Sequence, residues 1–232
     1  MSIIFESVNR FQFALREVLI LIEYSAKEEK QRDTSNVFLK SALILLTIKL
    51  EVFLEDISSE YISFINKELK IEQISDEIKL GYSKQLFKSF YDVSCHPHKK
   101  SESIEYMKQL SNLWQNIGPT QINIETKFNY GNHGEDEINF LFEKIGIENI
   151  WDKITITKKQ NTIDGGVEIT IVDFKNIVNG ITYQRNNIIH QDATISFTKE
   201  EISEYVDYCK QLSVQIAKFL EKELNKYKKI KC

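Results

Sequence analysis

The chain of 232 residues has few of the residues that interrupt helices, with only two prolines and eight glycines. This scarcity favours long helices, because proline removes a backbone donor and glycine has low helix propensity. The cysteines, Cys95, Cys209 and Cys232, are odd in number and widely scattered. We therefore expect reduced thiols in a cytoplasmic protein rather than a disulfide framework.

The sequence also lacks long apolar runs and a strong charge of one sign. The run Ala42–Leu46 lies between Lys40 and Lys49 and is too short to cross a bilayer, and no signal peptide opens the chain. We therefore expect no membrane partner. The net charge of −4 is not that of a general nucleic-acid-binding protein, so any contact with RNA must be local. An apolar content of 42% is enough for a core, and we expect residues 1–232 to form one domain.

Apolar residues recur at helical spacing along most of the chain. The second predicted helix is apolar over a broad arc in its first half, so we expect it to be the central buried element. Thr34 or Ser35 would cap it, and Thr198–Glu201 is a capping box for the last helix. We expect the final two helices to pack antiparallel around the loop 191–197. The predicted helices lie at about residues 2–29, 34–69, 75–93, 101–116, 134–145, 174–190 and 199–227.

Two β-branched runs interrupt this helical pattern. Ile154–Lys158 and Val167–Val172 flank the turn-rich stretch Asn161–Gly166. They predict a small hairpin or irregular structure within an insertion at about residues 119–172. The expected fold class is therefore all-α, a helical bundle with a long central helix and a small irregular or hairpin insertion.

A dense group of polar side chains lies within Tyr183–Gln191, near the end of the sixth predicted helix. In a helix, Asn186 and His190 share a face because they are four residues apart, and Arg185 flanks them. An always-charged planar donor beside an imidazole that titrates near neutrality suits phosphate chemistry. The alternative is a capped helix end with a solvated Arg185 and a packed His190.

The motif Arg-Asn-Asn-Ile-Ile-His at Arg185–His190, late in a helical chain and followed by a polar loop and a final helix, resembles the signature of the HEPN superfamily. The segments Lys127–Gly134 and Glu137–Phe142 resemble the middle of MAE-type and RiboL-PSP-type HEPN nucleases. One departure is Gln191, where many relatives have glycine. The resemblance covers most of the chain in helix order.

The resemblance implies a metal-independent endoribonuclease of a toxin–antitoxin or phage-defence system, which leaves 2′,3′-cyclic phosphate ends and needs no cofactor. It also implies a homodimer in which two motifs face one cleft. Cleavage requires proton transfer and positive charge on the phosphate. His190 would be the acid or base, Arg185 would clamp the scissile phosphate, and Asn186 would orient the phosphate or the imidazole. The alternative is a non-catalytic HEPN module that binds RNA or nucleotide, or docks a partner protein such as an antitoxin.

Other polar groups have simpler interpretations. Cys95, His96 and His98 offer three zinc ligands within four residues, but neighbours this close rarely bind one ion together, so we expect a loop and no metal. Asn132 and His133 precede a helix N-terminus and form either an accessory phosphate contact or a turn held by its glycines. Tyr183 is a further candidate RNA contact. The basic tail at 226–231 is a solvated helix end or an RNA-binding stripe.

Overall fold

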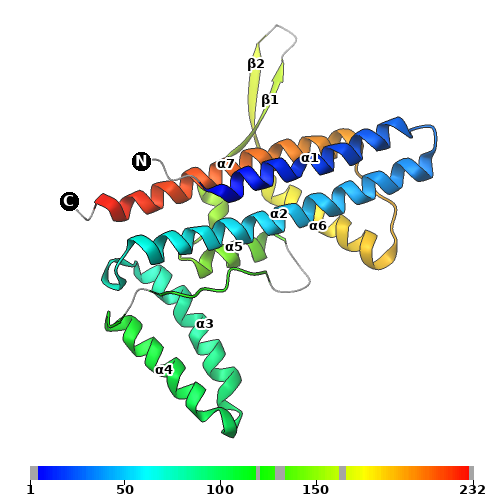
Figure 1. Cartoon of the computed structure of the whole chain (residues 1–232). Helices are drawn as coiled ribbons and strands as arrows, with labels where there is room; N and C mark the ends of the chain where they lie inside the picture. The colour runs from blue at the N-terminus through cyan, green and yellow to red at the C-terminus, as the bar shows by residue number, and fades with distance from the viewer. Residues whose placement is uncertain (1–4, 119–120, 129–133, 162–165, 230–232) are drawn as a thin grey trace.

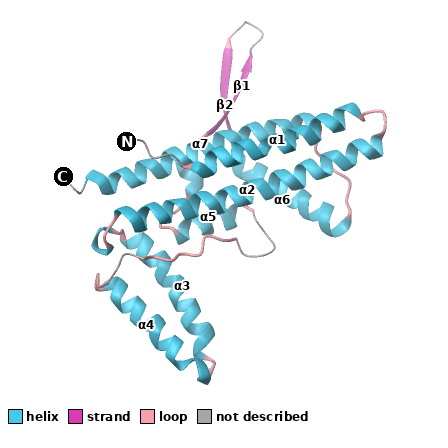
Figure 2. Ribbon diagram, viewed as in Figure 1, coloured by secondary structure: helices cyan, strands magenta, loops and turns pink. Residues whose placement is uncertain are grey.

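The computed structural model describes residues 5–118, 121–128, 134–161 and 166–229 (Figures 1 and 2). These residues contain seven α-helices and one two-stranded sheet, which confirms the all-α fold class with a small hairpin. The elements are α1 (Glu6–Lys27), α2 (Arg32–Glu68), α3 (Asp76–Ser94), α4 (Lys100–Trp114), α5 (Glu135–Lys144), β1 (Ile156–Asn161), β2 (Val167–Val172), α6 (Phe174–Gln191) and α7 (Lys199–Lys229). Short 3-10 turns lie at Ile71–Gln73, Pro97–Lys99 and Ile150–Lys153.

The 37-residue helix α2 is the central element, as its broad apolar arc predicted. It packs against α1, α5, α6 and α7, and in Figure 1 it lies between the pair α1 and α7 and the pair α5 and α6. Leu43, Phe53 and Ile57 on α2 are each at most 2% exposed. The Phe53 ring stacks on that of Phe11 from α1, with centroids 4.6 Å apart. Burial of this long helix on several sides therefore holds the bundle together.

Two expectations about helix ends met different outcomes. The capping box of α7 is confirmed, since Thr198 Oγ1 accepts from the Glu201 N–H at 3.2 Å and Glu201 accepts from the Thr198 N–H at 2.8 Å. The predicted cap of α2 is wrong, because the helix begins at Arg32. The Ser35 hydroxyl instead donates to the Ser25 carbonyl at 3.0 Å, so it joins α2 to α1.

The predicted pairing of α6 with α7 is also not the main packing. Helix α6 packs chiefly on α2, and α7 packs chiefly on α1 and α2. One direct contact between α6 and α7 is the edge-to-face pair of Phe174 and Tyr208, whose ring centroids are 6.3 Å apart. The wide apolar surface of α2 accounts for this arrangement, because both helices bury their apolar stripes on it.

Two hairpins project from the bundle (Figures 1 and 2). Strands β1 and β2 pair antiparallel from Ile156 with Val172 to Asn161 with Val167, which confirms a hairpin in place of irregular structure. Helices α3 and α4 pack on each other, and Trp114 Nε1 donates to Ser83 Oγ at 2.9 Å.

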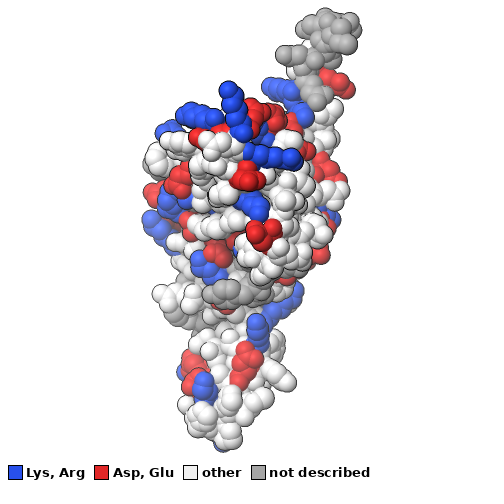
Figure 3. Space-filling view, turned by 90° about the vertical axis from the view of Figure 1, so that its right-hand side faces the viewer, with Lys and Arg blue, Asp and Glu red and all other residues white. Residues whose placement is uncertain are grey.

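Two features of the surface bear on function. None of the helices in the described part of the chain is long and apolar enough to span a membrane. Figure 3 shows acidic and basic side chains interspersed on the face that it presents, so this face has no extended patch of one sign.

Candidate functional site

Helix α6 carries the predicted site residues. One side of this helix is apolar and packs on the core. Val178, Ile181 and Ile188 are at most 7% exposed, which leaves the polar positions on the other sides. The helix begins at its cap Asp173, whose Oδ1 accepts from the Asn176 N–H at 3.2 Å.

The other end of α6 is tied to α2. Asp192 follows the helix in the left-handed conformation, with φ of 48°, and its carboxylate accepts from Lys40 Nζ at 2.8 Å. This hydrogen bond and the charge of Lys40 lower the pKa of Asp192 below its usual range. Because Asp192 lies two residues after His190, this exposed ion pair is a contact between α2 and the chain at the end of the candidate site.

Arg185 and Asn186 form a pair on α6. Arg185 Nη1 donates to Asn186 Oδ1 at 2.8 Å, and both side chains are half-buried. Arg185 Nε is buried, and no residue within the described ranges accepts a hydrogen bond from it. A guanidinium has five N–H donors, so Nη hydrogens beyond the one bonded to Asn186 are left for a further acceptor, whereas the buried Nε–H is not accessible to a ligand.

His190 is exposed at the last turn of the helix. Arg185 and His190 lie about 140° apart around an ideal helix. Their side chains therefore project in different directions and would contact one ligand from two different sides. Tyr183, seven residues before His190, shares its face of the helix and is 69% exposed. Ile189, beside them, is 46% exposed. The helix thus presents one imidazole, one phenol and one apolar side chain to the surroundings.

A pocket of about 370 Å³ lies between α6 and the first turn of α5. Asn179 joins the two helices, because its Oδ1 accepts from the Glu135 N–H at 2.9 Å. The pocket brings together two of the predicted residues, Tyr183 and Asn186. Arg185 reaches it through Asn186, whereas His190 is not among the residues that line it. Asn132 and His133 lie outside the described residues.

Carboxylates dominate the α5 side of this pocket. Glu135, Asp136 and Glu137 occupy the first turn of α5, where the helix dipole favours acidic side chains. Lys175 pairs with Glu135 at 2.9 Å. The acidic first turn makes this wall of the pocket unfavourable for a phosphate.

Two glutamates of α2 lie near the candidate site although the sequence pattern did not predict them there. Glu51 lines a small cavity with Thr182 of α6, one turn before Asn186. Glu55, one turn further along α2, accepts from the Phe128 N–H at 2.9 Å and from Lys127 Nζ at 2.6 Å. The one sequence feature that could have predicted them is a pair of acidic residues, four positions apart, within a largely apolar helix. In this structure Glu55 holds the segment ending at Phe128, and Glu51 and Phe128 line the same small cavity against α6.

The remaining candidates lie elsewhere on the molecule. Cys95, His96 and His98 are exposed at the turn between α3 and α4, and the His96 and His98 ring centroids are 5.6 Å apart. Among the described residues, no three His, Cys, Asp or Glu side chains are placed to hold a metal ion. In the basic tail, Lys226 pairs with Glu223 at 2.6 Å.

The long central helix, the helices packed around it and the Arg/His-bearing α6 are the features of a HEPN domain. The sequence matches the family described as RiboL-PSP-HEPN over residues 9–222, from the first turn of α1 into the last part of α7. The chain therefore belongs to the RiboL-PSP-HEPN family, which confirms the resemblance. No curated protein and no solved structure matches the chain. HEPN domains are often ribonucleases, so the family supports an RNA-related role, as a nuclease or as a binding module.

Proposed function

We propose that the protein is a metal-independent endoribonuclease whose reaction centre is built on α6. The observation that carries the proposal is the combination on one helix of the Arg185–Asn186 pair, with guanidinium donors left over, and the exposed imidazole of His190. Membership of a HEPN family supports it. Setting in a toxin–antitoxin or phage-defence system, and a cytoplasmic location, are part of the proposal and follow from the resemblance.

The chemistry assigns one role to each residue. The 2′-oxygen attacks the adjacent phosphorus, the bond to the 5′-oxygen breaks, and a 2′,3′-cyclic phosphate remains on the upstream fragment. His190 takes the proton of the 2′-hydroxyl or gives a proton to the leaving 5′-oxygen. The Arg185 guanidinium balances the charge on the phosphorane, and Asn186 holds that guanidinium in place. In this proposal the scissile phosphate lies next to Arg185 and away from the first turn of α5, because the acidic side chains of that turn would repel it.

A single histidine supplies only one of the two proton transfers. We propose that a second copy of the chain supplies the other, so that two α6 helices face one cleft in a C2 homodimer. The exposed side chains of Tyr183 and Ile189 beside His190 support this arrangement, because a self-complementary contact through α6 would cover them. The RNA strand is then the substrate held between the two copies.

The proposal is tested by RNA cleavage in the presence of EDTA. The wild-type protein should convert an RNA oligomer to fragments with 2′,3′-cyclic phosphate ends. His190→Ala should slow cleavage by roughly 10²–10⁴-fold, as expected for loss of an acid or base, without lowering Tm. His98→Ala removes an exposed histidine at the α3–α4 turn and is the matched control, with unchanged cleavage.

Two results would contradict the proposal. If His190→Ala lowers Tm but leaves cleavage per folded molecule unchanged, His190 is a structural side chain. If the wild-type protein binds RNA and never cuts it, the protein is a binding module, the alternative within the same family.

A further inference from the structure

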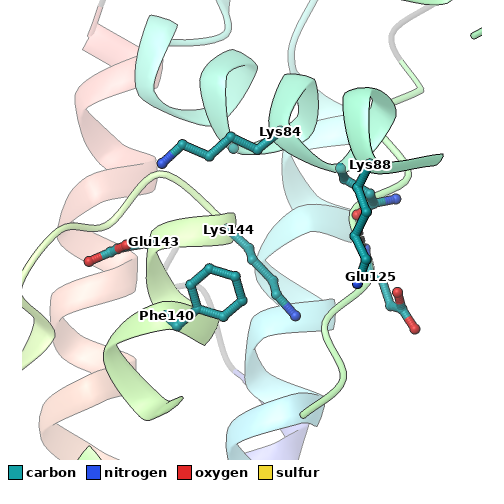
Figure 4. Close-up of a pocket in the computed structure, with 8 residues that line it drawn as sticks. Lys84, Lys88, Glu125, Phe140, Glu143 and Lys144 are labelled. Carbon is teal, nitrogen blue, oxygen red and sulfur yellow. Dashed lines mark hydrogen bonds between the residues drawn. The ribbon is translucent and has the colours of Figure 1, made fainter. Parts of the chain in front are cut away.

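A second pocket, of about 140 Å³, lies between α3 and the far end of α5 (Figure 4). The first turn of α5 lines the pocket at α6, whereas Phe140, Glu143 and Lys144 at its other end line this one. Helix α5 has ten residues, so about 15 Å of helix separates its two ends. The pocket is therefore distinct from the candidate reaction centre.

A glycine makes the close approach of the two helices possible. A Cβ placed on Gly81 would lie 2.2 Å from the carbonyl oxygen of Lys144. Helix α3 thus touches the end of α5 at Gly81, and the next two turns of α3 carry Lys84 and Lys88 along the pocket. Sequence positions more than fifty residues apart are brought together by this contact.

Three lysines gather at this pocket without pairing to carboxylates. No ion pair to Lys84, Lys88 or Lys144 is formed by the residues that the structure describes, although Glu125 and Glu143 also line the pocket. Figure 4 shows the Lys144 side chain beside the Phe140 ring and the Lys88 side chain beyond Lys144, near Glu125. Burial lowers the pKa of Lys144; the carboxylate of Glu125 opposes this shift, and the positive charge of Lys88 adds to it. An anion bound between these two ammonium groups would relieve their repulsion.

The pocket also offers an aromatic surface. Phe140 is 45% exposed, and Lys144 Nζ lies 5.2 Å from its ring centroid while donating to the Lys127 carbonyl at 3.0 Å. Gln85 frames the opposite side, since it accepts from the Glu125 N–H at 2.7 Å and donates to the Asn123 carbonyl at 2.8 Å. A flat apolar ring beside the Lys144 ammonium group, with Lys88 also lining the pocket, matches a ligand with an aromatic base and a phosphate.

We propose that this pocket binds one nucleotide unit, with its base on Phe140 and its phosphate between Lys88 and Lys144. Lys84 stands at the rim of the site and adds positive charge. The unit belongs either to a free mononucleotide or to an RNA strand, because both offer the same base and phosphate. The site does not depend on cleavage at α6.

The test measures binding by isothermal titration with AMP, adenosine and inorganic phosphate, and by fluorescence anisotropy with a labelled RNA oligomer. All measurements use the His190→Ala protein, so that the result does not depend on cleavage. Lys88→Glu and Phe140→Ala should each raise Kd by about tenfold. Lys108→Glu, which makes the same charge change on α4 away from the pocket, should change Kd less than about twofold.

The outcomes show whether the bound nucleotide unit belongs to a free mononucleotide or to an RNA strand. AMP that binds more tightly than adenosine or phosphate, and loses affinity in Lys88→Glu, identifies a site for a free mononucleotide. RNA that loses affinity in Lys88→Glu and Phe140→Ala, without binding of AMP, identifies a site for an RNA strand. The proposal is overturned if neither ligand binds, or if Lys88→Glu and Lys108→Glu weaken binding equally, since the effect is then one of overall charge.

Discussion

The side chain of Arg185 is oriented by its neighbour in the sequence, Asn186. Arg185 lies about 140° around the helix from His190, and its guanidinium is held by Asn186, with no carboxylate paired to it among the residues that the structure describes. A guanidinium without an acidic partner keeps its full charge available to a ligand. At the scale of one residue, the proposed function thus depends on the geometry of a single side-chain hydrogen bond.

We expect Arg185→Lys to recover only part of the activity that Arg185→Ala loses. The lysine keeps the charge, but an ammonium cannot make the planar two-point contact with a phosphate. The alanine variant should cleave roughly 10²–10³-fold more slowly, because a charged group at the phosphorane is absent. Single-turnover cleavage of an RNA oligomer measures both variants, with Arg16→Lys on α1 as the control. Full activity in Arg185→Ala would rule out the clamp.

The sequence predicted some of the side chains at the candidate site and not others. Tyr183, Asn186 and Arg185 were predictable because they are neighbours on one helix, where spacing fixes their relative positions. Glu51 and Glu55 were not, because acidic residues on a long helix normally face solvent. Only the packing of α2 against α6 and the segment ending at Phe128 turns them inward.

Helix ends and helix partners were predictable to different degrees. The caps Asp173 and Thr198 act within four residues of sequence, so their residue types are sufficient to predict them. Ser35 has the residue type of a cap, but its hydroxyl bonds to Ser25 on another helix. The partner of α6 was mistaken for a similar reason, because the choice between α7 and α2 depends on surfaces that are distant in sequence.

Two glycines in helices should respond to alanine in opposite ways. Gly81→Ala should destabilise the protein by about 1–3 kcal/mol, because the new Cβ would overlap the Lys144 carbonyl oxygen at 2.2 Å. Gly180→Ala should stabilise it by about 0.5–1 kcal/mol, because alanine favours the helix. At Gly180 the new Cβ would meet Phe197 at an ordinary 3.8 Å. Urea denaturation of both variants measures the difference, and a stabilised Gly81→Ala protein would disprove the close approach of α3 and α5.

For the whole molecule, we expect a homodimer with α6 in its interface. Light scattering at micromolar concentration should give twice the chain mass of 27.2 kDa. Ile189→Glu places a charge on an exposed apolar position next to His190, so it should produce monomers and abolish cleavage. Phe13→Glu changes a position on α1 that is 66% exposed and should leave the dimer intact. A wild-type monomer that cleaves RNA would refute the shared centre.

Contact between the first and last helices has a consequence for the order in which the protein is made. Gln12 of α1 donates to Ser213 of α7 at 3.2 Å, across 201 positions of sequence. Leu15 and Val18 of α1 are completely buried in a core that includes Leu212 and Ile216 of α7. During synthesis α1 leaves the ribosome long before α7, and contacts this distant in sequence form slowly. The bundle is therefore completed only when translation of α7 is finished, and until then the nascent chain exposes the apolar face of α1 that α7 later covers.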